Sequence, residues 1–109
     1  MRTMTGQDLI EEGKSDHFPV GAGWKQLVLD LNEKLLALQP DYVIDQIKEK
    51  FGGLRFYASG FSNSCHDDAY RLITKAENDL YGICEKCGKP GELRTGGWLK
   101  TLCDECVKG

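Results

Sequence analysis

Two pairs of cysteines near the end of the chain have the spacing of a metal site. Cys84 and Cys87 form one Cys-x-x-Cys pair, and Cys103 and Cys106 form the second. Four cysteines can supply four thiolates to one tetrahedral Zn²⁺, because each short pair closes a tight loop around one side of the ion. Four thiolates leave no coordination position for a reactive water, so the sequence predicts a structural zinc ion.

Other chemistry for the same cysteines has to be weighed. Four thiolates also accept a rubredoxin-like iron, and a single Cys-x-x-Cys pair can be redox-active. Two pairs converging on one point favour a metal. A disulfide framework is not expected, because five cysteines is an odd number and no secretion signal is apparent. We interpret the fifth, Cys65, together with His66, as a thiol beside a histidine at a helix start, and not as further metal ligands.

The segment between the two pairs predicts a zinc ribbon. Gly88 follows the first pair and suits a tight turn whose backbone N–H groups point at sulfur. Residues 92–95 and 98–102 are separated by two glycines, which is a β-hairpin signal. Trp98 would either pack on this ribbon or stand exposed as a contact residue.

Three elements are expected to position the metal site. Apolar residues recur at three- and four-residue steps over 24–38 and predict a helix. Residues 42–59 are rich in β-branched and aromatic side chains and predict a hairpin that turns at Gly52-Gly53. A second helix is expected to follow the loop 60–65 and to run straight into the first cysteine pair, so that placing the helix places the site.

We therefore expect an α+β protein with the order helix, β-hairpin, helix and C-terminal four-cysteine zinc ribbon. Residues 1–20 are polar and weakly patterned, and predict a flexible lead-in within which residues 8–12 can start a short helix. Residues 21–83 are expected to form the core, and residues 84–109 a ribbon continuous with it.

Composition narrows the functional classes. The chain has 109 residues and a net charge of −3, which argues against gripping nucleic acid through a broad basic surface. No apolar run is long enough for a membrane span, and a cytoplasmic protein is expected. No Ser-His-Asp pattern, phosphate loop or H-E-x-x-H motif occurs, so we do not expect an enzyme.

Basic and aromatic residues gather in the predicted hairpin and form the candidate binding group. They can be a hairpin core with solvated rims, a platform that stacks the bases of single strands, or an edge that pairs with a partner strand. The candidate partner-binding residues are Lys48, Lys50, Phe51, Arg55, Tyr57 and Trp98.

Two resemblances add to this interpretation. Gly23-Trp24 with its leucine stripe, the stretch from Gln46 to Tyr57 that contains KEKFGGLRFY, and the four-cysteine tail resemble a group of small, largely uncharacterised proteins of bacteriophages and prophages. This resemblance spans residues 20–107 and implies a phage or prophage origin without assigning an activity.

Separately, residues 81–88 and 102–106 are similar to the zinc finger of the DksA/TraR family. Those proteins bind bacterial RNA polymerase and reach into its secondary channel with acidic residues on a helical tip. The present chain has a predicted β-hairpin where that family has a helical coiled coil.

Together these features lead us to expect a non-enzymatic zinc-binding protein that modulates a host protein, such as a defence component or the transcription machinery. In that setting it would act in the host cytoplasm. The alternative is a nucleic-acid-binding regulator that uses the ribbon and the hairpin at 46–57.

Overall fold

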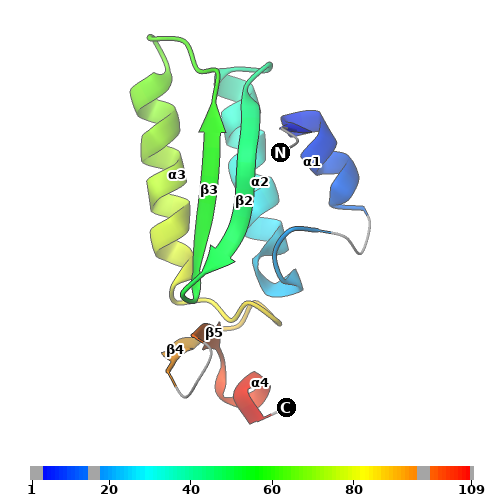
Figure 1. The fold of residues 1–109 in the computed structure, drawn as a ribbon, viewed down its shortest axis with the longest axis vertical. Coiled ribbons are helices and arrows are strands. Elements are labelled where there is room, and N and C mark those ends of the chain that lie inside the picture. The colour runs from blue at the N-terminus through cyan, green and yellow to red at the C-terminus, as the bar shows by residue number, and fades with distance from the viewer. Residues whose placement is uncertain (1–3, 15–17, 96–98, 109) are drawn as a thin grey trace.

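The computed structural model describes residues 4–14, 18–95 and 99–108, and shows a mixed α/β protein with antiparallel strands (Figure 1). The elements follow in the order β1 (Met4–Thr5), α1 (Gly6–Glu12), α2 (Ala22–Leu38), β2 (Val43–Lys50), β3 (Gly53–Ser59), α3 (His66–Leu80), β4 (Glu92–Arg94), β5 (Lys100–Leu102) and α4 (Asp104–Lys108). None of the helices in these residues is long and apolar enough to cross a membrane.

A three-stranded sheet in the order β1-β2-β3 forms the centre of the fold. Strands β2 and β3 make the predicted hairpin, but its turn lies one residue earlier than expected. Phe51 and Gly52 are the two turn residues, with φ of 55° and 80°, while Gly53 already belongs to β3. A tight hairpin turn with two positive φ angles matches the right-handed twist of the strands. The observed register places Ile47 directly opposite Phe56, and both side chains are buried.

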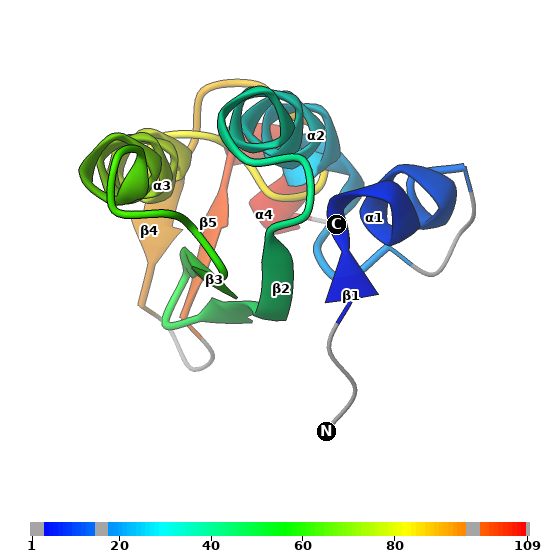
Figure 2. The ribbon, with the colours of Figure 1, turned by 90° about the horizontal axis from the view of Figure 1, so that it is seen from above.

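Helices α2 and α3 cover one face of the sheet, and no helix among the described residues covers the other (Figure 2). Side chains alternate accordingly along β3, where Leu54, Phe56 and Ala58 are buried against the helices. Arg55 and Tyr57 lie between them in sequence and point to the opposite, open face. The apolar stripe of α2, including Trp24, joins the same core.

Side chains of α3 partly occupy the outer edge of β3. The backbone N–H of Phe56 donates to Glu77 Oε2 at 2.9 Å, and Tyr70 Oη donates to the carbonyl of Ala58 at 2.7 Å. These contacts occupy two of the backbone groups that an incoming strand would use. Less of the β3 edge is therefore available to a partner strand.

The start of the chain is packed against the core over its described residues, whereas the sequence led us to expect a mobile or loosely docked lead-in. Thr5 caps α1 through a reciprocal pair of hydrogen bonds with Asp8, and Leu9 is fully buried. Buried Asn32 on α2 donates to the carbonyl of Gly6 at 2.9 Å. The sequence is mostly polar here because most side chains of this short helix lie on its outer side, while its inner side is apolar.

Candidate metal centre and the surfaces around it

The four cysteines of the two pairs come together at one end of the molecule. Their Sγ atoms all lie within 4.8 Å of one another, and Cys87 Sγ is 3.6 Å from Cys103 Sγ. In a tetrahedral zinc site with Zn–S bonds of about 2.3 Å, neighbouring sulfurs are about 3.8 Å apart. The cluster therefore has the ligand number and the spacing that a single metal ion needs.

The first pair sits in a tight turn that follows α3. The N–H of Gly88 donates to the carbonyl of Cys84 at 2.9 Å, and the N–H of Cys84 donates to the carbonyl of Lys89 at 2.8 Å. Gly88 has a φ of +82°, a conformation that costs glycine little and other residues more. The glycine after the pair has the role that the sequence indicated.

The second pair is built differently, because the chain continues into α4 after Cys103. The N–H of Cys106 points at Cys103 Sγ at 3.4 Å, and Val107 donates to the Cys103 carbonyl at 3.0 Å. A helical turn supplies the N–H groups here, which explains why no glycine follows this pair.

Hydrogen bonding divides the thiols into two kinds. Burial acts to raise the pKa of Cys84, but backbone N–H groups at Cys103, Cys87 and Lys86 outweigh it and lower that pKa to about 6. The pKa of Cys106 is raised to about 12, chiefly by its side-chain hydrogen bond to Cys103. In the metal-free protein some thiols of the cluster therefore stay protonated, and a metal ion has to displace those protons when it binds.

The first cysteine turn is docked onto the start of α2. The N–H of Gly23 donates to the carbonyl of Glu85 at 2.9 Å, and Trp24 Nε1 donates to the carbonyl of Ile83 at 2.7 Å. A Cβ on Gly23 would lie 2.1 Å from the carbonyl oxygen of Cys84, so no larger residue fits there. No periodicity or motif marks this contact, because it joins Gly23 to residues far along the chain.

The β4–β5 hairpin makes a second contact, with the turn between β2 and β3. Thr101 Oγ1 donates to the carbonyl of Gly52 at 2.6 Å in a buried hydrogen bond. Next to it, Lys100 Nζ lies 3.2 Å from Glu85 Oε1, and the Glu85 side chain is only 10% exposed. No motif marks these residues, because their meeting depends on how the two hairpins are oriented.

The fifth cysteine takes no part in the cluster. Cys65 is buried at the opposite end of α3, where its Sγ lies 3.4 Å from Ser62 Oγ and 3.7 Å from Gln39 Oε1. The ring of His66 lies against Tyr70, with their centroids 4.6 Å apart. Cys65 and His66 are therefore helix-start residues, as interpreted from the sequence.

Most of the predicted binding residues share the open face and tip of the β2–β3 hairpin. Lys48 and Arg55 are directly opposite each other across the strands, and Tyr57 is 45% exposed beside them. At the tip, Phe51 is 61% exposed and the ammonium of Lys50 lies 5.5 Å from its ring centroid. Trp98 lies outside the described residues.

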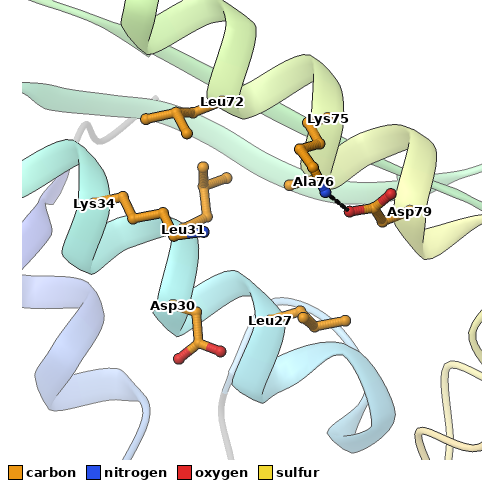
Figure 3. Close-up of a pocket in the computed structure, with 8 residues that line it drawn as sticks. All are labelled: Leu27, Asp30, Leu31, Lys34, Leu72, Lys75, Ala76 and Asp79. Carbon is orange, nitrogen blue, oxygen red and sulfur yellow. Dashed lines mark hydrogen bonds and ion pairs between the residues drawn. The ribbon is translucent and has the colours of Figure 1, made fainter.

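A hollow lies between α2 and α3 (Figure 3). Its volume of about 100 Å³ is below the usual range for small-molecule sites. Lys75 and Asp79 on its rim pair with each other at 2.8 Å. Leu27, Leu31 and Leu72 supply its apolar wall, and nothing in this lining indicates a reaction.

The fold and the cluster define a mixed α/β protein with four cysteines placed so that they can hold a metal ion. Comparison with protein families, with characterised proteins and with solved structures gives no match. Function therefore has to be inferred from the chemistry of the residues described above.

Proposed function

We propose that the four cysteines hold a structural Zn²⁺ and that residues 84–109 work as a zinc ribbon. The observation that carries this proposal is the spacing of the four Sγ atoms, all within 4.8 Å. Four thiolates complete a tetrahedral zinc sphere, so the ion fixes the chain and does not activate water. The first cysteine turn packs on α2, and the hairpin between the two pairs contacts the β2–β3 turn, so metal binding also stabilises the rest of the protein.

The proposed role of this zinc-stabilised protein is non-enzymatic binding of a host protein, in a phage or prophage setting. Candidate partners are a defence component or the transcription machinery. Support comes from the exposed aromatic and cationic side chains on one side of the hairpin, since Tyr, Phe and Arg are enriched in the centres of protein interfaces. Tyr57 is 45% exposed on the open face that also carries Arg55, and Phe51 is 61% exposed at the tip beside Lys50.

A pulldown from host lysate tests this role. Zinc-loaded protein is immobilised, lysate is applied with and without nuclease, and retained proteins are identified by mass spectrometry. The control is the double variant Cys84→Ser/Cys87→Ser. A host protein that is retained after nuclease treatment and lost with the control supports the proposal. Retention of no protein above the control counts against it.

A nucleic-acid-binding regulator is the second candidate, and one observation favours it. Lys48 and Arg55 face each other without an ion-pair partner among the described residues, next to the exposed ring of Tyr57. Cations beside an aromatic ring can hold a single strand by its phosphates and bases. This role predicts binding that weakens with salt and with Arg55→Gln, and recovery of partners only from lysate without nuclease.

A further inference from the structure

The outer edge of β2 is only partly covered. Strand β1 pairs with β2 at Val43 and Ile44, and no other strand in the described parts of the chain joins that side. From Gln46 to Lys50 no strand of the described residues pairs with this edge. On the opposite edge of the hairpin, side chains of α3 occupy two backbone groups of β3.

The hydrogen-bonding pattern of the hairpin identifies which backbone groups this edge presents. Phe56 pairs with Ile47 across the hairpin but gives its N–H to Glu77, so the groups of this pair point outward. In an antiparallel ladder the pair two residues away has the same orientation. The N–H and C=O groups of Ile47 and Glu49 thus face the open side, with no hydrogen-bond partner in the described residues.

Charge determines which strand fits this edge. Lys48 and Lys50 lie two residues apart on the open face of the sheet, and Lys48 has Arg55 directly across the hairpin. None of these three cations forms an ion pair within the described residues. Side chains directly opposite on paired strands are about 5 Å apart, so acidic residues at alternate positions of an added strand would meet both lysines.

On the basis of the proposed binding function, we propose that the β2 edge binds an extended acidic segment of a partner protein by strand addition. The backbone of Ile47 and Glu49 supplies the hydrogen bonds, and Lys48 and Lys50 select acidic residues two positions apart. Lysines on an edge strand disfavour pairing with neutral or basic strands, and here they make the edge selective for an acidic strand. A second copy of this chain is disfavoured, because edge-to-edge pairing about a two-fold axis at Lys48 or Glu49 sets lysines opposite lysines.

The first experiment is an NMR titration of the zinc-loaded protein with a synthetic peptide of alternating valine and glutamate. We expect the amides of Ile47 and Glu49 to become protected from exchange with solvent. A peptide with glutamine in place of glutamate, and a single-stranded oligonucleotide, serve as comparison ligands. Equal binding of the oligonucleotide at this edge, no binding of the acidic peptide, or protection of both amides in the free protein would each overturn the proposal.

Two matched pairs of variants separate charge from backbone pairing. Lys48→Glu/Lys50→Glu should weaken peptide binding about tenfold or more, whereas Lys34→Glu, at an exposed position of α2, should not. Glu49→Pro removes an outward N–H while keeping the β2–β3 ladder, and should also weaken binding about tenfold. Glu49→Ala keeps that N–H. Like Glu49→Pro, it loses the carboxylate that accepts from the Gly52 N–H at 3.2 Å, so it is the matched control and should bind the peptide normally. Equal binding by Glu49→Pro and Glu49→Ala would refute strand addition.

The lysate pulldown distinguishes this inference from the proposed function. A host protein retained by the wild type and by Glu49→Ala but lost with Glu49→Pro supports strand addition. A host protein retained by all three refutes the β2 edge as its site while leaving the binding function intact. Retention of no protein by the wild type counts against the function itself.

Discussion

The substitution Gly23→Ala tests whether the cysteine turn is docked onto α2. Alanine in an exposed helix normally stabilises it by up to about 1 kcal/mol relative to glycine. Here the new Cβ would lie 2.1 Å from the carbonyl oxygen of Cys84 and 2.5 Å from the N atom of Gly88. Both are backbone atoms of the cysteine turn, so that turn would have to move away from the helix.

The expected cost follows from two hydrogen bonds that this movement disrupts. The bond from Gly23 N–H to Glu85 and the one from Trp24 Nε1 to Ile83 would break or lengthen. Each contributes about 1 kcal/mol, and a buried group left without a partner costs a further 1–3 kcal/mol or so. We expect Gly23→Ala to lower the free energy of unfolding by about 2–4 kcal/mol, a large share of the roughly 5–15 kcal/mol typical of a native protein.

Urea unfolding of the zinc-loaded protein measures this loss, and chelator competition shows whether zinc is held less tightly. Gly82→Ala is the matched control, because its Cβ would meet only the carbonyl oxygen of Asp79 at 3.9 Å. The control should be neutral or slightly stabilising. A Gly23→Ala protein as stable as Gly82→Ala, with unchanged zinc retention, would refute the docking of the cysteine turn onto α2.

Three further predictions concern the metal, the hairpin contact and pH. Elemental analysis should find one zinc per chain in the wild type and in the control Cys65→Ser, but none in Cys84→Ser. Removing the zinc with a chelator should lower the Tm reversibly. Unchanged zinc content in Cys84→Ser would contradict the site. Thr101→Val should cost about 1–3 kcal/mol in urea unfolding, because it leaves the buried Gly52 carbonyl without its donor. Burial raises the pKa of Tyr42 above its usual value, so the unfolded chain ionises first and the free energy of unfolding should fall as pH rises above about 10. Tyr42→Phe should flatten that fall, which pH-dependent urea curves would show.

The sequence predicted the parts of the fold that depend on local pattern. Periodic leucines marked α2, alternation marked the β2–β3 hairpin, and two Cys-x-x-Cys pairs marked the cluster. These signals are strong because each is contained in a short stretch of chain. The mixed α/β class follows directly from them.

Long-range contacts escaped the same reasoning. Leu9 is fully buried although the stretch around it is mostly polar, since a single inward residue makes no periodic pattern. Position 23 has to be glycine because the carbonyl oxygen of Cys84, far along the chain, lies too close to leave room for a Cβ. Thr101 matters because its hydroxyl donates to the carbonyl of Gly52. Such requirements become visible only when the elements are placed together.

The docking of the cysteine turn onto α2 also has a consequence for synthesis on the ribosome. Helix α2 follows Gly21 and has no side-chain cap, and the N–H of Gly23 in its first turn is satisfied by the carbonyl of Glu85. Translation at about 5–20 residues per second separates these two positions by roughly 3–12 s. During that interval the nascent helix lacks this hydrogen-bond acceptor. The cysteine turn therefore completes the first turn of a helix that was translated long before it.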